Sequence, residues 1–227
     1  LELWIKALAA NCQKLLTAIS SGDVHRWITS KLFKKPEAAV TKLERDFGKR
    51  FVYAEAYGAE ALKIHQTLTS YFDKKLRRYP FSNTTLGEVT ALLAAWRREF
   101  EELVWYSQQS YAVAQARGFA QSLVMERPKY FLDGWEYTKV INFPIQSTAG
   151  DITNIAVENL EIFAAAAGLG MPLKVQLHDE LLIEVPEAQA SLGERVLKAA
   201  MEHEVLIPDI NGTLHAVTFP VDTKTDT

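Results

Sequence analysis

The sequence contains little cysteine, no long apolar run and no large excess of either charge. A single cysteine, Cys12, among 227 residues excludes a disulfide framework and a zinc site built from cysteines, and it favours a reducing cytoplasm. No uninterrupted apolar run approaches the ~18 residues that a membrane-spanning helix needs, and no secretory leader is visible. We therefore expect a cytoplasmic location, bacterial or phage-like, and no membrane partner.

The charge balance is close to neutral, and there is no internal repeat or low-complexity stretch. With 48% hydrophobic and 23% charged residues and a formal net charge of −3, the chain can bury a sizeable core, in one large domain or two closely packed lobes. This balance neither favours nor excludes a nucleic-acid partner, so local clusters of lysine and arginine matter more. Because the sequence starts at Leu1 rather than at methionine, we expect it to be part of a longer polypeptide, or one product of a split one.

Helical periodicity covers most of the chain, and strand-like alternation is confined to its second half. The spacing of apolar residues and the stop signals predict helices over residues 1–19, 24–33, 36–58, 59–71, 86–117, 147–168 and 186–203. Ser147 or Thr148 is the expected cap of the long helix, and Gly168 is its expected stop. The basic, turn-rich segment "KKLRRYPFSNTT" is expected to be a surface excursion. The fold class predicted is helix-rich α+β with a small antiparallel sheet.

The segment "LKVQLHDELLIEVP", residues 173–186, predicts a hairpin with an unusual tip. Apolar residues alternate on both sides of His178, Asp179 and Glu180, which predicts two strands that each bury one face. Carboxylates held on a rigid turn can bind a hard divalent cation such as magnesium, which prefers oxygen ligands. The alternative is an ordinary polar turn, which explains the tip less well when the flanking strands are this apolar.

Four residues spaced by four, Arg45, Lys49, Tyr53 and Tyr57, are expected on one face of the helix predicted over residues 36–58. Two cations followed by two aromatic rings could hold a polyphosphate at one end and stack a flat base at the other. From this helix alone, a solvated basic face whose tyrosines merely pack is the favoured interpretation.

In "VINFPIQSTAGD", Asn142 and Gln146 stand immediately before the predicted start of the long helix. Their amide side chains could read the minor groove of a nucleic acid or could cap backbone groups, and capping is the commoner use.

Taken together and in order, these segments resemble the family A DNA polymerases. "RDFGKRFVYAEAYG" is similar to motif B of that family, R-x3-K-x7-Y-G, and "LHDELLIEVP" is similar to motif C. "NFPIQSTAGD" resembles the palm segment that opens the long helix, "GDVHRWITSKLF" resembles the segment between motifs A and B, and Leu1-Glu2-Leu3 resembles the tail of motif A. The resemblance runs almost from end to end. It implies a DNA-directed DNA polymerase that acts on deoxynucleoside triphosphates (dNTPs) and primer-template DNA with two magnesium ions.

The resemblance implies a role for each residue of the nucleotide side of the site. Arg45, Lys49 and His25 would hold the triphosphate, with Lys49 counted among the catalytic residues. Tyr53 would lie against the sugar and base, and Tyr57 would lie near the templating position. Glu2 would crowd the ribose 2′ position and so favour deoxynucleotides.

The resemblance also implies roles at the hairpin and the primer. Asp179 would be a catalytic metal ligand, Glu180 would support the catalytic site, and His178 would lie beside the primer terminus. Gln146 would contact the minor groove at the primer end, and Asn142 is placed with it as a DNA-binding residue. Residues 1–24 would be a palm segment, 25–117 the fingers, and 118–227 the palm with the motif C hairpin.

The sequence departs from the family pattern in ways that leave two hypotheses open. The second metal-binding aspartate of the family would fall before Leu1, and Trp4 stands where the family usually has arginine. The stretch from about His65 to Leu92 is longer than in compact members. One hypothesis is a catalytic fragment that needs an upstream portion carrying motif A and the thumb, in the same or a separate polypeptide. The alternative is a non-catalytic nucleic-acid-binding remnant of such a polymerase.

Overall fold

The computed structural model describes residues 1–225, and its first half is entirely helical. The helices of this half are α1 (Glu2–Ala9), α2 (Gln13–Ser20), α3 (Val24–Phe33), a 3-10 turn (Glu37–Ala39), α4 (Lys42–Ala56), α5 (Ala61–Thr69), α6 (Leu86–Glu99) and α7 (Glu101–Arg117). No helix in the described range is long and apolar enough to cross a membrane.

The second half combines two helices with three short hairpins. Its elements are β1 (Ala120–Gln121), β2 (Pro128–Lys129), α8 (Tyr137–Ala166), β3 (Leu173–Leu177), β4 (Glu180–Ile183), a 3-10 turn (Glu187–Gln189), α9 (Ala190–Met201), β5 (Glu204–Pro208) and β6 (Leu214–Thr218). Within residues 1–225, the strands pair only inside their own hairpins, as three antiparallel two-stranded sheets. The predicted fold class, helix-rich α+β with small antiparallel sheets, is confirmed.

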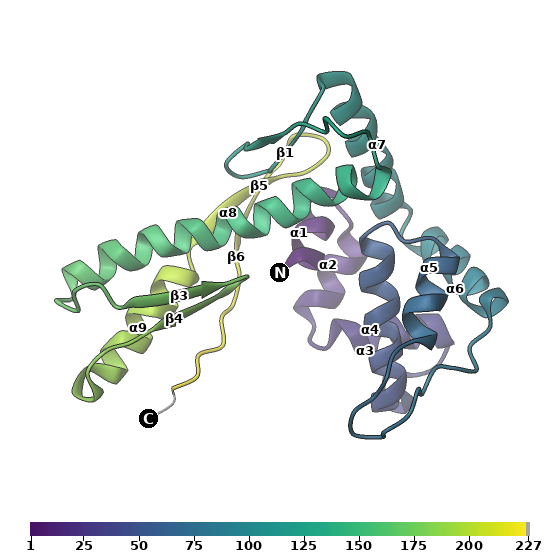
Figure 1. Cartoon of the computed structure of the whole chain (residues 1–227), viewed down its shortest axis with the longest axis horizontal. Helices are drawn as coiled ribbons and strands as arrows, with labels where there is room; N and C mark the ends of the chain where they lie inside the picture. The colour runs from purple at the N-terminus through teal and green to yellow at the C-terminus, as the bar shows by residue number, and fades with distance from the viewer. Residues whose placement is uncertain (226–227) are drawn as a thin grey trace.

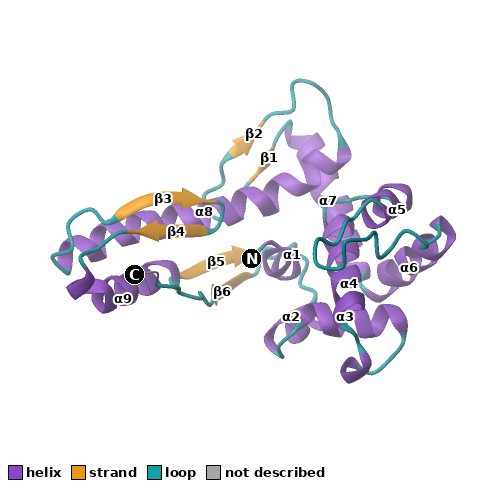
Figure 2. Cartoon of the chain, turned by 60° about the horizontal axis from the view of Figure 1, so that its bottom comes forward, coloured by secondary structure: helices purple, strands orange, loops and turns teal. Residues whose placement is uncertain are grey.

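Helix α8 runs along the molecule and separates two groups of elements (Figure 1). Helices α2–α6 lie around one end of α8, and the β3–β4 hairpin and α9 lie along its other end, as the second view also shows (Figure 2). The N-terminus lies between these two groups, so α1 is placed where they meet.

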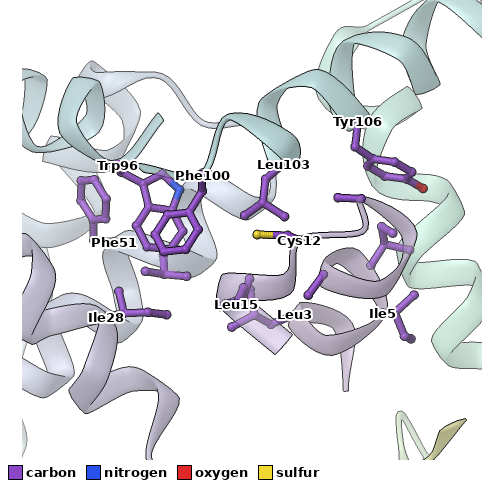
Figure 3. Close-up of a cluster of buried hydrophobic side chains, with 14 of the residues drawn as sticks. Leu3, Ile5, Cys12, Leu15, Ile28, Phe51, Trp96, Phe100, Leu103 and Tyr106 are labelled. Carbon is purple, nitrogen blue, oxygen red and sulfur yellow. The ribbon is translucent and has the colours of Figure 1, made fainter. Parts of the chain in front are cut away.

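A large apolar core holds the helical group together. Phe51, Phe100 and Ile28 are fully buried in it, and Trp96 packs on Phe100 with ring centroids 4.1 Å apart (Figure 3). The indole Nε1 of Trp96 donates a hydrogen bond to the buried Glu55 carboxylate at 3.0 Å, so this polar group of α4 is satisfied inside the core. A separate, smaller cluster joins the second half of α8, β4 and α9.

The sequence at the start of α4 explains why the helix begins where it does. Thr41 and Glu44 form a capping box, in which the Thr41 hydroxyl accepts from the Glu44 backbone and the Glu44 carboxylate accepts from the Thr41 backbone. The predicted start at Pro36 is wrong, because Pro36 instead precedes the separate 3-10 turn. The predicted stop is right, since Gly58 follows the helix with φ +79°.

Three further helix predictions need correction. Residues 86–117 form α6 and α7 rather than one helix, because the backbone leaves the helical conformation at Phe100 (φ −124°, ψ +54°). Residues 1–19 form two helices rather than one, because Asn11 has φ +51° and breaks the helix, so that Cys12 and Leu15 turn into the core. The long helix begins at Tyr137 rather than at Ser147 or Thr148, and it continues through Pro144. Val140, Ile141, Pro144 and Ile145 are buried at helical spacing, and this burial outweighs the ~3 kcal/mol that an interior proline costs.

The β3–β4 hairpin exists, and β4 buries Leu181 and half-buries Ile183 as the alternation predicted, but β3 leaves Val175 and Leu177 exposed. Leu177 pairs with Glu180 across the turn, and Val175 pairs with Leu182. Because paired residues share a face, Val175 and Leu177 lie opposite to the face that Leu181 buries. Val175, Leu177 and Leu182 are therefore 39%, 60% and 58% exposed. Leu173, beyond a register shift, pairs with Ile183 and packs against the cluster that contains Leu181.

Candidate active site

The aromatic and basic stripe of α4 lies on one face of the helix, as predicted. The Lys49 ammonium is 5.9 Å from the Tyr53 ring centroid, and the Tyr53 and Tyr57 rings are 6.4 Å apart. Lys49 is exposed and takes part in no ion pair with a described residue. Its charge is therefore available to a ligand.

Helix α3 packs closely on α4 and places His25 beside the stripe. A Cβ atom on Gly48 would lie 2.0 Å from the Thr29 Oγ1, so only glycine permits this approach. The His25 and Tyr53 ring centroids are 5.6 Å apart. The His25 Nδ1 is buried and has no hydrogen-bond partner within residues 1–225. Burial, and then the charges of Lys49 and Arg45, lower the pKa of His25 to about 4.

Arg45 was expected to be a cation that binds the triphosphate, but in the structure its guanidinium already binds an acidic neighbour. Its Nε donates to the Asp23 carboxylate at 2.6 Å, while Asp23 also caps α3 by accepting from the Arg26 backbone. Burial opposes ionisation of Asp23, but these hydrogen bonds outweigh it and keep its pKa below the usual value. Our sequence reasoning missed Asp23, although its position after Gly22 at a helix start is typical of an N-cap.

Tyr57 ties the end of α4 to α1 and α8. Its hydroxyl donates to the Glu2 carboxylate, and its backbone carbonyl accepts from the Asn142 amide at 2.9 Å. Burial, followed by the Glu2 contact, raises the pKa of Tyr57. Asn142 therefore satisfies backbone at a helix end, the commoner use of such an amide, although it lies within α8 rather than before it.

Lys6 is a second residue that our sequence reasoning missed. It is buried, its Nζ donates to the Ala56 carbonyl at 2.8 Å, and burial lowers the pKa of its ammonium. A cation at the C-terminus of α4 complements the helix dipole, so Lys6 fixes α4 on α1 beneath the stripe. In the sequence, Lys6 is a lone lysine within an apolar helix, and such a residue carries no pattern from which this role could be predicted.

The elements converge on a pocket of about 480 Å³ that polar and apolar residues line together. The structure brings together five of the predicted site residues there: Glu2 from α1, Tyr53 from α4, Gln146 from α8, and His178 and Asp179 from the hairpin tip. Arg45, His25 and Glu180 do not line this pocket, and Lys49 and Asn142 line a neighbouring groove of about 770 Å³ that also contains Tyr53 and Tyr57.

The hairpin tip has a constrained backbone. His178 has φ +54°, in the left-handed region that is uncommon for residues other than glycine, and Asp179 completes the two-residue turn. Both side chains are exposed. Because the turn is tight, the side chains of His178 and Asp179 lie at the rim of the pocket and are not packed against other elements within residues 1–225.

The carboxylates of this pocket meet part of the requirement for a hard cation. Asp179 and Glu2 both line it, but Glu2 is engaged by Tyr57, and residues 1–225 contain no group of three or more potential metal ligands. Magnesium commonly uses one or two carboxylates together with substrate phosphates and water. The Asp179 carboxylate at the pocket could supply one oxygen ligand to such a site.

The carboxylate turn of the hairpin and Tyr53 of α4 meet in one pocket, and Lys49 lines the groove beside it. The chain belongs to DNA polymerase family A, since the family model matches residues 1–225. The predicted membership is thereby confirmed.

Relatives and a solved structure agree with this assignment. The chain is 29% identical over 209 residues to DNA polymerase I of Chloroflexus aurantiacus, and 25% identical over 212 residues to the thermostable DNA polymerase I of Thermus thermophilus. These matches cover 88% and 89% of the chain but only 21% and 23% of the relatives, so the chain spans less than a quarter of their length. The POL domain of Pol1 from M. smegmatis, in complex with DNA primer-template and dNTP, is similar with a TM-score of 0.74 and 26% identity, covering 88% of the chain and 35% of that domain's chain.

Proposed function

We propose that this chain supplies the nucleotide-binding helix and part of the catalytic surface for template-directed DNA synthesis, acting with an upstream portion of the polymerase. The reaction is nucleotidyl transfer from a dNTP to a primer 3′-hydroxyl by a two-metal mechanism. The observation that carries the proposal is the pocket where the Asp179 turn meets Tyr53, Glu2 and Gln146 in a chain of this family. We assign residues 1–24 to the palm, 25–117 to the fingers and 118–227 to the palm, in a cytoplasmic enzyme.

The stripe of α4 accounts for recognition of the incoming nucleotide. The Lys49 ammonium, which has no ion-pair partner among residues 1–225, and the Arg45 guanidinium give a phosphate chain two cations on one helix face. Arg45 already uses its Nε toward Asp23, which leaves the two Nη groups as donors and fixes their direction. The neutral His25 ring supports Tyr53, so the phenol is held against the pocket before a nucleotide enters.

At the other side of the pocket, the hairpin turn supplies a metal-binding carboxylate. Bound magnesium ions would activate the attacking primer oxygen and neutralise the charge that develops on the phosphoryl group. Asp179 holds one carboxylate at the rim of the pocket, Glu180 adds negative charge behind it, and His178 lies beside the primer end. Glu2 is held by Tyr57 where a ribose 2′-hydroxyl would enter, which favours deoxynucleotides.

Two observations support the need for an upstream portion. The described residues carry Asp179 without the further carboxylates of a complete metal site. The hairpin also leaves Val175, Leu177 and Leu182 exposed on one face, an apolar surface that a packed partner element would cover. We therefore place the second metal-binding aspartate and the grip on duplex DNA in that portion, in the same or a separate polypeptide.

Reconstitution tests this function and separates it from the alternative of a non-catalytic DNA-binding remnant. The purified 227-residue chain is expected not to extend a labelled primer with magnesium and dNTPs. Adding a polypeptide that carries the upstream half is expected to restore extension, and omitting magnesium to abolish it. Binding of primer-template without any extension by the mixture would favour the remnant, whereas robust extension by the chain alone would show that no upstream portion is needed.

A further inference from the structure

A basic loop between α5 and α6 plays no part in the pocket described above. It comprises residues 72–79, "FDKKLRRY", with four cations and one acid. Figure 1 shows the connection from α5 to α6 extending away from α8, at the far end of the α4–α5 pair. Its cations are all exposed, and none forms an ion pair within the described part of the chain.

The loop has a defined internal structure. The Asp73 carboxylate accepts hydrogen bonds from the backbone N–H groups of Lys75 and Leu76 at 2.8 and 2.9 Å, and the Asp73 N–H donates to the Arg78 carbonyl at 2.9 Å. The one acid of the loop is thus used to shape the backbone. The four cationic side chains are left pointing to a ligand or to solvent.

Aromatic residues anchor the base of the loop to α4. The guanidinium carbon of Arg50 lies 3.3 Å from the Tyr71 ring centroid, and Tyr71 stacks on Phe81 with centroids 5.8 Å apart. Phe81 is buried against Phe47 of α4. The loop is therefore held in one place relative to the stripe of α4.

Two further aromatic rings are exposed on the loop itself. Phe72 and Tyr79 are 44% and 53% exposed, and their rings meet edge to face at 5.2 Å. Exposed rings beside several free cations are the combination that single-stranded nucleic acids use, since phosphates bind the cations and unpaired bases stack on the rings. A duplex, whose bases are already stacked, would use only the cations.

A groove connects this loop with the stripe of α4. The groove of about 770 Å³ begins at Asn142 and Tyr57 and ends at Tyr71, at the base of the loop. Lys49, Arg50 and Lys63 line it with Asp46 as the one acid, so its charge is net positive. Along α4 it extends from Asp46 to Tyr57, which corresponds to about 16 Å of helix.

We infer that the groove and the basic loop bind the unpaired template strand ahead of the site of synthesis. This assignment rests on the proposed function, which places Tyr57 near the templating position. The strand would pass from Tyr57 along the groove between α4 and α5, with its phosphates reaching Lys74, Lys75, Arg77 and Arg78 and its bases stacking on Phe72 and Tyr79. From the sequence alone, this segment was expected to be a surface excursion without an assigned role.

Binding of labelled dT20 to the 227-residue chain, followed by fluorescence anisotropy from 50 to 200 mM salt, is the direct test. The loop variant replaces all four loop cations by alanine and retains Asp73, Tyr71 and Phe81, so that the loop keeps its anchors. A control variant of equal net charge removes four exposed cations elsewhere, by Lys34→Ala, Arg98→Ala, Arg117→Ala and Arg195→Ala. The loop variant is expected to bind at least about tenfold more weakly, with the slope of log K against log salt smaller by up to about 2.8. The control variant is expected to change less than about threefold.

Two comparisons sharpen the outcome. Phe72→Ser with Tyr79→Ser is expected to weaken dT20 binding about tenfold without changing the salt slope, because stacking involves no counterion release. Binding of a 20-base-pair duplex is expected to change less than about threefold in this aromatic variant. The assignment would be overturned if the loop variant and the control variant lost the same affinity for dT20. It would also be overturned if the aromatic variant lost the same affinity for the duplex as for dT20.

Extension assays with the reconstituted polymerase link the loop to the template. The loop variant is expected to slow extension about tenfold on a template with a 20-nucleotide overhang and to leave extension unchanged on a one-nucleotide overhang. Equal rates of wild type and variant on both templates would show that the loop does not bind the template. A complete absence of synthesis by wild type would contradict the proposed function, while the dT20 measurements would still decide whether the loop binds single strands.

Discussion

The face of α4 and the tip of the β3–β4 hairpin contribute to one pocket but are built in opposite ways. Tyr53 and Tyr57 are half-buried in a network of rings and hydrogen bonds, whereas His178 and Asp179 project from a turn whose strands are largely exposed. Burial has shifted pKa values on the α4 side, downward for His25 and upward for both tyrosines. The α4 side is thus organised before a ligand arrives, while the hairpin side leaves His178 and Asp179 exposed.

The largest expected effect lies at the hairpin tip. In the reconstituted polymerase, Asp179→Asn should lower turnover by about three orders of magnitude or more, because a neutral amide cannot hold the cation or offset its charge. DNA affinity should change little, since phosphate contacts carry most of it. Steady-state primer extension and anisotropy measure the two quantities.

Glu180→Gln is the matched control for Asp179→Asn, since it removes the adjacent charge and is expected to have a milder effect. Because both residues are exposed, neither change should lower the melting temperature of the chain. Near-normal turnover by the Asp179 variant would remove it from the metal site.

The second prediction contrasts the stability of the two regions. Phe51→Ala on α4 should cost about 3–5 kcal/mol in the free energy of unfolding, because Phe51 is fully buried. Leu177→Ala on the hairpin should change the free energy of unfolding of the isolated chain by no more than about 0.5 kcal/mol, because Leu177 is 60% exposed. Urea unfolding measures both. With the upstream polypeptide present, Leu177→Ala is expected to weaken association, and an unchanged Kd would mean that this face stays uncovered.

The third prediction concerns one hydroxyl on the α4 side. Members of the family carry phenylalanine or tyrosine at the position matching Tyr53, and the resemblance implies that this choice governs the use of dideoxynucleotides. A dideoxynucleotide leaves polar groups unpaired where a 3′-hydroxyl would bind, and a tyrosine hydroxyl can restore a hydrogen bond there. Tyr53→Phe should therefore raise discrimination against dideoxynucleotides by roughly 1–3 kcal/mol, about 5- to 150-fold.

The measurement for Tyr53→Phe is the ratio of kcat/KM for deoxy and dideoxy substrates. Tyr137→Phe, at the start of α8, removes a phenol hydroxyl from outside the pocket and should leave the ratio unchanged. An unchanged ratio in Tyr53→Phe itself would remove this residue from the nucleotide site.

The last expected effect is the pH dependence that His25 gives to stability. Its folded pKa of about 4 lies below its ordinary value of 6.5, so the unfolded chain binds more protons between these values. The contribution of His25 is complete above pH 6.5 and is lost as pH falls from 6.5 toward 4. Urea unfolding at pH 7 and pH 5 should show a smaller decrease for His25→Asn than for wild type. Equal decreases would show that burial does not perturb this ring.

The comparison also shows which elements the sequence could predict. The bounds of α3, the stop of α4 at Gly58, and the hairpin itself follow from local chemistry: an Asp23 cap, a left-handed glycine, and alternation around a polar tip. The tip is two residues rather than three, because Glu180 pairs with Leu177 in the ladder. The break at Asn11 and the passage of α8 through Pro144 do not follow from local chemistry. Both depend on burial against segments distant in the sequence, which outweighs the local preference.

For the site, the sequence by itself determined the residue types, their order and the spacing that puts Arg45, Lys49, Tyr53 and Tyr57 on one helical face. Membership of the family follows from that same order. Only the tertiary structure decided that Asp23 holds Arg45, that Tyr57 is tied to Glu2, and that Val175 and Leu177 lie opposite to the face that Leu181 buries. The physical reason is that periodicity is a local property of a helix or strand. Partners in hydrogen bonds, ion pairs and packing come from other elements, and their positions depend on how the whole chain packs.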